Sequence, residues 1–251
     1  MKQSFSWWCV VNCGVEPEAL LAGAAKIGYQ GVDLIDEALW PLAKKHGLRI
    51  VAVNGHGTID DGLNRGENAG RIEQELRANI VKAQQWNIPA LICFSGQRHG
   101  PSDEEGIKQC AETLAKVAPF AAESGVVLTM ELLNSKVDHR GYQCGHTDWG
   151  VKMCQAVKSP AVRLLYDIYH MQIMEGDIIR TIQANHEFIA HYHTAGNPGR
   201  GQPDETQEIY YPAIYRAIAK TGYTGFIAHE FIPSGDPLEA LKKAYDDCAK
   251  A

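Results

Sequence analysis

The alternation of short apolar segments with amphipathic segments constrains the fold of this chain more than any other feature. Each apolar run rich in strand-forming residues is followed by a segment with helical spacing. In Pro17–Ile27, for example, the large apolar residues share one helical face. Strands that alternate with helices form parallel sheets with right-handed crossovers. The predicted strands are Phe5–Asn12, Gly31–Ile35, Leu48–Asn54, Ala90–Phe94, Val126–Leu133, Val162–Ile168, Phe188–Thr194 and Phe226–Phe231.

Eight such strands predict an α/β fold, a (β/α)8 TIM barrel. The chain of 251 residues has the usual size of one barrel. Because no composition break marks a linker, we expect a single domain over residues 1–251. A doubly wound open sheet is the structural alternative.

Composition excludes several classes of function. The net charge is −6 and no dense Lys/Arg run occurs, which disfavours a nucleic-acid partner. Seven scattered cysteines are typical of a reduced, cytoplasmic protein rather than a disulfide framework. No apolar run is long enough to span a membrane, and Phe5–Val11 lacks the features of a signal peptide. We therefore expect a cytoplasmic protein with neither a nucleic-acid nor a membrane partner. A small molecule is the partner expected instead, and a homo-oligomer is left open.

Four polar side chains occupy late positions in the last four predicted strands. They are Glu131, Asp167, His193 and Glu230. Strand side chains alternate between faces, and active sites of barrel enzymes lie at the carboxyl ends of the strands. The four residues are therefore expected to converge on one ion at the barrel mouth.

The alternative interpretation treats each residue separately. An acid at a strand end often caps a helix, and His191 or His193 alone can be a hydrogen-bonded core histidine. Burying four ionisable groups without a counter-charge would be very costly, however, and a divalent cation removes that cost. Three carboxylates and one imidazole suit one Mn²⁺, Mg²⁺ or Co²⁺ ion better than structural zinc. No dinucleotide fingerprint, nucleophile elbow or phosphate-binding loop competes with this interpretation.

Such a site can move a proton between the carbons of an α-hydroxy carbonyl through an enediolate. Glu131 and Glu230 are the candidate acid/bases that would flank the substrate. In the long polar loop Ala195–Tyr210, Arg200 is the best candidate to hold an anionic end of the substrate. A loop of this length is typical of a lid. In the other long loop, His56 and Arg65 are weaker candidates for substrate contact.

Several motifs resemble the hydroxypyruvate isomerase family of xylose-isomerase-like barrels, which is related to the ketose 3-epimerases. They are Met130-Glu131-Leu-Leu-Asn134, Asp167-Ile-Tyr-His170-Met-Gln172, His193-Thr-Ala-Gly-Asn197-Pro-Gly199-Arg200 and Ala228-His-Glu230-Phe. The resemblance implies that Glu131, Asp167, His193 and Glu230 hold the metal. It also implies that Glu131 and Glu230 move the proton, and that His170 and Arg200 contact substrate oxygens.

The resemblance implies an aldose-ketose type isomerase that converts hydroxypyruvate to tartronate semialdehyde. Many hydroxypyruvate isomerases have Gln at the fourth ligand position, whereas this chain has His193, as the ketose epimerases do. A ketose 3-epimerase acting on a free sugar is therefore the alternative. Two further alternatives are a non-catalytic sugar-binding barrel and a nuclease similar to endonuclease IV. The nuclease lacks support because no Asp-x-His follows His193 in the loop and the chain is acidic.

Overall fold

A computed structural model describes residues 1–250, which form two compact units. Unit 1 contains residues 1–51, 177–186 and the chain from His191 onward. Unit 2 contains residues 52–176 and 187–190. No helix among the described residues combines the length and apolar character needed to cross a membrane.

The sheet of unit 1 is parallel throughout. Its strand order is β3-β2-β1-β9-β8, and every neighbouring pair is parallel. The bounds are β1 (Lys2–Ser6), β2 (Gly31–Asp33), β3 (Arg49–Ile50), β8 (Ile189–Thr194, of which His191–Thr194 belong to this unit) and β9 (Phe226–His229). The register places His193 opposite Ala228, so Glu230 follows just beyond the end of β9.

The sheet of unit 2 is also parallel, with strand order β7-β6-β5-β4. Its strands are β4 (Ala52–Asn54), β5 (Ala90–Cys93), β6 (Val127–Glu131) and β7 (Val162–Asp167). Glu131 pairs with Leu165, so Asp167 lies two residues further along its own strand. Both acids thus occupy the carboxyl ends of neighbouring strands.

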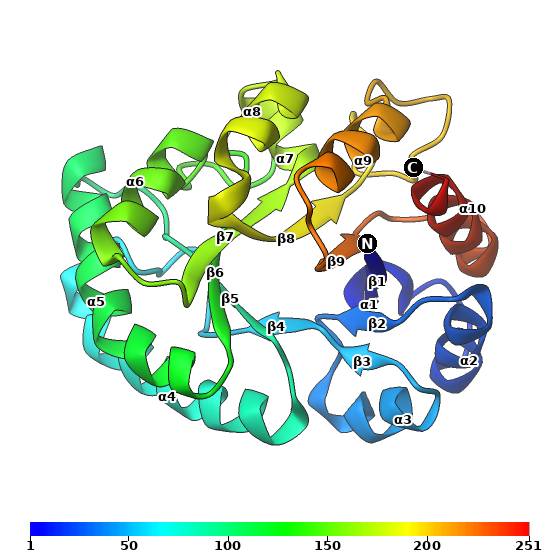
Figure 1. The fold of residues 1–251 in the computed structure, drawn as a ribbon, viewed down its shortest axis with the longest axis horizontal. Coiled ribbons are helices and arrows are strands. Elements are labelled where there is room, and N and C mark those ends of the chain that lie inside the picture. Colours follow the sequence, from blue (N-terminus) through cyan, green and yellow to red (C-terminus); the bar gives the residue numbers. More distant parts are fainter. Residues whose placement is uncertain (251) are drawn as a thin grey trace. The chain divides into compact units, whose positions relative to one another are not determined.

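Helices follow the strands in both units (Figure 1). Unit 1 has α1 (Trp7–Val10), α2 (Pro17–Ile27), the 3-10 turn η1 (Glu37–Leu39), α3 (Trp40–Lys45), α8 (Ile178–Asn185), α9 (Tyr211–Lys220) and α10 (Pro237–Ala249). Unit 2 has η2 (Gly66–Asn68), α4 (Ala69–Trp86), α5 (Asp103–Glu123), α6 (Thr147–Val157) and α7 (Ile168–Met174). A short turn, η3 (His186–Phe188), precedes β8. The predicted alternation of strands and parallel crossovers is confirmed within each unit.

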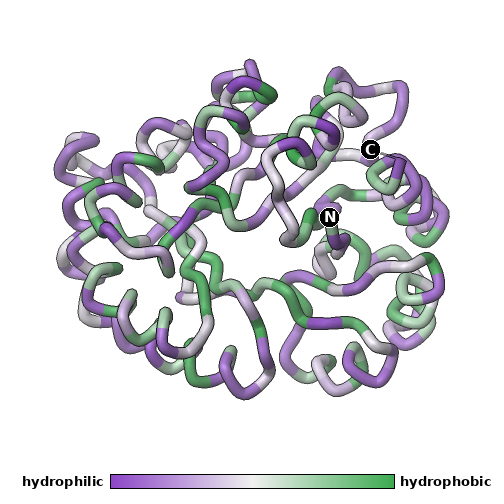
Figure 2. Tube along the Cα trace, viewed as in Figure 1, coloured by the Kyte–Doolittle hydropathy of each residue, from purple (hydrophilic) through white to green (hydrophobic). Residues whose placement is uncertain are grey.

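Amphipathic patterning explains why these helices pack on the sheets. In α2 the residues Leu20, Leu21 and Ala24 are buried, as their spacing predicts. The start of α5 is fixed by a capping box, in which Ser102 and Glu105 exchange hydrogen bonds. Figure 2 shows the helices changing between hydrophobic and hydrophilic residues along their length, whereas β5 is uniformly apolar.

Two strand predictions need correction. The predicted strand Phe5–Asn12 ends at Ser6, and the chain then turns into α1. Pairing of β1 with its neighbours stops at Phe5 and Ser6, so the residues that follow have no ladder partner. The predicted strand Leu48–Asn54 is divided into β3, which pairs with β2, and β4, which pairs with β5.

The helix α7 was not predicted from the sequence. The predicted strand Val162–Ile168 ends one residue early, and Asp167 becomes the N-cap of a helix. Its carboxylate accepts a hydrogen bond of 3.2 Å from the backbone N–H of His170. Asp167 therefore caps a helix, as the alternative interpretation of an acid at a strand end predicts.

Candidate active site

His193 and Glu230 form the centre of the site in unit 1. His193 Nδ1 lies 2.8 Å from Glu230 Oε2, and both side chains are buried. The other carboxylate oxygen of Glu230 accepts hydrogen bonds from Ser6 Oγ at 3.0 Å and Trp8 Nε1 at 2.8 Å. Burial disfavours the charged form of Glu230, but the positive charges of His193 and Arg200 outweigh it, so the pKa of Glu230 lies well below its usual value. Glu230 is thus an ionised buried carboxylate at neutral pH.

Arg200 contacts Glu230 directly in this structure. Its Nη2 donates to the same Oε2 that faces His193. Its guanidinium carbon also lies 5.5 Å from the centre of the Trp8 ring, which is a cation–π distance. The positive charge of Arg200 thus compensates the negative charge of the buried Glu230 carboxylate. The predicted role of Arg200 in holding the substrate stays a prediction.

The loop that carries Arg200 is internally bonded. Gly196 N–H donates to Gly201 O at 2.7 Å, and Glu208 N–H donates to Asn197 O at 2.8 Å. The backbone oxygen of Arg200 accepts from Ile232 N–H at 2.9 Å. These bonds tie the loop to the segment after β9, and its predicted role as a lid stays a prediction.

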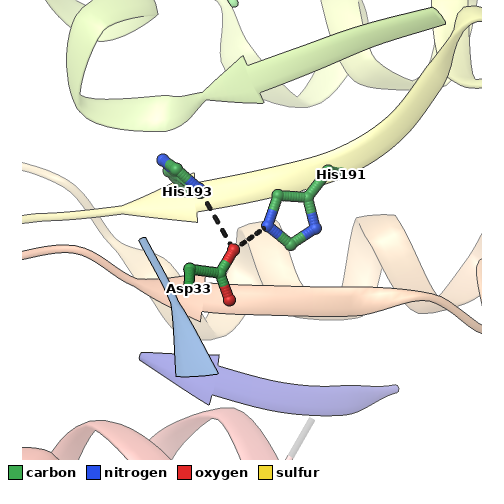
Figure 3. Close-up of side chains that lie close together, drawn as sticks. All are labelled: Asp33, His191 and His193. Carbon is green, nitrogen blue, oxygen red and sulfur yellow. Dashed lines mark hydrogen bonds and ion pairs between the residues drawn. The ribbon is translucent and has the colours of Figure 1, made fainter. Parts of the chain in front are cut away.

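Asp33 is a buried residue of this unit that we did not predict. It lies at the end of β2, and its Oδ2 is 2.6 Å from His191 Nε2 and 3.6 Å from His193 Nε2 (Figure 3). Burial opposes its ionisation, but the neighbouring histidines outweigh that effect and lower the pKa of Asp33. The acid inside the apolar run GVDLI was the signal that could have identified it.

In unit 2, Glu131 and Asp167 end neighbouring strands, and both are buried. Asp167 Oδ2 lies 3.6 Å from His170 Nε2. His170 Nδ1 lies 3.2 Å from the backbone nitrogen of Asn134, whose N–H donates to it, and this arrangement requires Nδ1 to be the acceptor. The proton of a neutral His170 therefore resides on Nε2, which faces Asp167.

A pocket of about 620 Å³ lies beside this group. Asp138 and His139 belong to its wall, and both approach His170: Asp138 Oδ2 lies 3.9 Å from His170 Nδ1, and the rings of His139 and His170 are 5.4 Å apart. Asp138 accepts hydrogen bonds from Asn134 and from Tyr169. The complete lining is Ile59, Asp60, Gln97, Val137, Asp138, His139 and Arg140. The charged stretch 136–140 after β6 was the sequence signal that could have identified this wall.

The two weaker candidates have structural partners. His56 is buried; its Nε2 accepts from the backbone N–H of Phe94 at 3.0 Å, and its Nδ1 donates to Gly57 O at 2.8 Å. Burial lowers the pKa of His56, in agreement with a neutral ring. Arg65 forms an ion pair with Asp61. Substrate contact by His56 and Arg65 stays a prediction.

Comparison with known proteins identifies the fold of the whole chain. A family described as the xylose isomerase-like TIM barrel matches residues 21–248. A solved structure titled AP endonuclease, family 2, from Brucella melitensis has a TM-score of 0.87 at 23% identity, over 98% of this chain and 99% of that chain. At that identity the likeness shows the fold alone. The predicted TIM barrel is confirmed, and the open sheet is excluded.

Curated relatives carry isomerase names. The "Putative hydroxypyruvate isomerase" of Homo sapiens is 26% identical over 95% of this chain and 91% of its own length. The "2-oxo-tetronate isomerase" of Cupriavidus necator is 34% identical over 49% of this chain and 46% of its own length. The resemblance to hydroxypyruvate isomerases is therefore confirmed. With nine-tenths of its length matched by one family, the chain belongs to the xylose isomerase-like TIM barrel family.

Proposed function

We propose that this protein is a divalent-metal-dependent isomerase that converts hydroxypyruvate to tartronate semialdehyde. The enzyme class itself, an isomerase, is supported by the names of the curated relatives, which refer to hydroxypyruvate and to 2-oxo-tetronate. The observation that carries the mechanism is the ionised, buried Glu230 in contact with His193. A cytoplasmic location and a single domain remain predictions.

The metal set is proposed from strand position and family fold. Glu131, Asp167, His193 and Glu230 stand at the ends of β6, β7, β8 and β9 or just beyond. In a TIM barrel the carboxyl ends of all strands open at one face. We propose that the four residues hold one Mn²⁺, Mg²⁺ or Co²⁺ ion there.

The side chains within each unit fit such an ion. In unit 1 an imidazole nitrogen and a carboxylate oxygen, both buried, approach to 2.8 Å. In unit 2 the two candidate acids are buried at adjacent strand ends. Oxygen-rich sets with one imidazole favour these divalent ions. A bound ion would supply Lewis-acid stabilisation of the charge that develops on the two substrate oxygens.

The protein side chains then perform the proton transfer. One carboxylate removes the proton from the hydroxymethyl carbon C3, the C3 hydroxyl proton moves to the oxygen on C2, and a proton returns to C2. Glu131 and Glu230 are the proposed carriers. Because Ser6, Trp8 and Arg200 all donate to Glu230, its basicity is low, so Glu131 is the better group for the first abstraction.

The substrate contacts are assigned in the same way. His170 presents Nε2–H next to Asp167 and would donate to a substrate oxygen. Arg200 would hold the carboxylate of the substrate once its pairing with Glu230 is relieved.

A ketose 3-epimerase is the second candidate. His193 favours it, and so does the pocket beside His170, which has room and polar groups for a chain longer than three carbons. The test is a substrate panel with Mn²⁺ present: hydroxypyruvate, four-carbon 2-oxo acids and free ketoses, followed by NMR. Conversion of the keto acids supports the proposal, whereas turnover of free ketoses alone would replace it with the epimerase.

A further inference from the structure

Asp33 has no role in the site proposed so far, although its burial is costly. The side chain is fully buried at the end of β2. Its Oδ2 is engaged by His191, while its Oδ1 has no hydrogen-bond partner among the residues that the structure describes. A buried carboxylate with an unsatisfied oxygen is destabilising unless a nearby positive charge compensates it. Within its unit, the groups that can supply that charge are His191 and His193.

His191 and His193 are two residues apart on β8, so both side chains leave the strand on the same face (Figure 3). The rings stand nearly perpendicular, with centroids 5.1 Å apart. Asp33 Oδ2 lies between them, at 2.6 Å from His191 Nε2 and 3.6 Å from His193 Nε2. The first distance is a short hydrogen bond, and the second is that of an ion pair.

The imidazole of His193 therefore stands between two carboxylates. Its Nδ1 faces Glu230 at 2.8 Å, and its Nε2 faces Asp33. A histidine that binds a metal uses one deprotonated ring nitrogen and carries a proton on the other. In known metal sites that proton is usually donated to a carboxylate or carbonyl, which fixes the ring and its tautomer.

We propose that Asp33 is a positioning residue that accepts the Nε2 proton of His193 and thereby presents Nδ1 to the divalent ion. His191 anchors Asp33 through the 2.6 Å hydrogen bond and keeps its Oδ2 directed toward His193. This inference rests on the proposed metal site and adds to it the choice of ligating nitrogen.

A second metal ion held by Asp33, His191 and His193 themselves is the competing explanation. Their ligand atoms lie within 4.8 Å of one another. The 2.6 Å between Asp33 and His191 leaves these two atoms in direct hydrogen-bond contact. Two ligands that each stand about 2.0–2.2 Å from one ion are usually further apart than this. The geometry therefore favours an Asp33 that is hydrogen-bonded to His191 and directed toward His193 over a second metal site.

The test compares Mn²⁺ binding by calorimetry in the unaltered protein and in the variant Asp33→Asn. This substitution keeps the shape of the side chain but removes its negative charge. Loss of a carboxylate behind a ligating histidine is expected to weaken metal binding by about 10- to 100-fold. Tyr29→Phe is the matched control, because it deletes one buried hydrogen bond in the same unit, from Tyr29 to the Leu241 carbonyl. Its metal affinity should match that of the unaltered protein.

The outcomes separate the two proposals. Unaltered protein that binds no divalent ion refutes the metal site and the inference together. Binding by the unaltered protein with equal affinity in Asp33→Asn refutes only the role of Asp33. Two bound ions in the unaltered protein and one in the variant would establish the second metal site instead.

A spectroscopic measurement keeps the inference testable if Asp33→Asn does not fold. Proton–nitrogen correlation spectra of the Mg²⁺-loaded protein distinguish the two histidine tautomers, and the His193 signals are assigned by their absence in His193→Gln. A proton on Nε2 supports the inference. A proton on Nδ1 would overturn it.

Discussion

Glu230→Gln is the substitution that separates proton transfer from metal binding. The amide has nearly the shape of the carboxylate and keeps one oxygen, which can still accept from Ser6 and Trp8. The other oxygen, which faces Arg200 and His193, is replaced by an NH₂ group that donates. In the metal-free protein this NH₂ group faces Arg200 Nη2 and His193 Nδ1, which are donors as well. The negative charge that compensated Arg200 is also lost.

The structure sets the expected magnitudes. A buried donor that loses its acceptor costs about 1–3 kcal/mol of unfolding free energy. If Glu230 carries a proton, kcat should also fall by at least about 100-fold, the usual scale for a general acid or base. Metal affinity should fall less, because the amide oxygen can still coordinate.

The assay follows both the formation of tartronate semialdehyde and the entry of deuterium at C3 of hydroxypyruvate in D₂O at saturating Mn²⁺. Urea unfolding of the metal-free protein is measured beside it. Glu16→Gln is the control, since it makes the same change at an exposed carboxylate of the same unit. Near-normal formation of tartronate semialdehyde in Glu230→Gln would leave Glu131 as the only proton carrier and refute the mechanism with two carboxylates. Exchange at C3 that continues while the product is lost would assign the return of the proton to C2 to Glu230.

Three further predictions follow from single residues. Asp167→Ala should abolish most Mn²⁺ binding in calorimetry, whereas Asp236→Ala, which removes the N-cap of α10, should cost only about 0.5–2 kcal/mol in urea unfolding and leave binding intact; equal binding in both variants would exclude Asp167 as a ligand. Arg200→Ala should raise KM more for hydroxypyruvate than for a neutral ketose, and an equal rise for both would show that Arg200 does not recognise the carboxylate. Burial lowers the pKa of His229 to about 3. Between about pH 6.5 and pH 3 the unfolded chain therefore binds a proton at this histidine and the folded protein does not, so stability is lost as pH falls through that range. His229→Gln should remove that part of the slope in urea unfolding between pH 7 and pH 5, and an unchanged slope would contradict the assignment.

The strand pattern made the candidate metal residues predictable. Alternation along an apolar strand shows which side chains share a face, and the last polar residue of each run lies at the carboxyl end. Glu131 and Asp167 are found there, on neighbouring strands, and His193 occupies the equivalent place on β8. Local periodicity carries this information because it depends only on strand geometry.

Contacts between distant segments were not predictable. Ser6 and Trp8 donate to Glu230 across more than 220 residues of sequence, and no local pattern encodes that approach. Asp33 was missed for the same reason, since only the folded unit brings it to His191. The helix α1 replaced part of a predicted strand because pairing ends at Ser6, a tertiary effect that outweighs the strand preference of the two tryptophans.

Solvent exchange at the substrate carbon tests the central claim most directly. Protein treated with a chelator should be incubated with hydroxypyruvate in D₂O, first alone and then with Mn²⁺, Mg²⁺ or Co²⁺ restored, while NMR follows the C3 protons. We expect exchange and formation of tartronate semialdehyde only after the ion is restored, and loss of both in Glu131→Gln. Exchange that persists in metal-free protein, or no exchange under any condition, would contradict a metal-dependent isomerase that works through an enediolate.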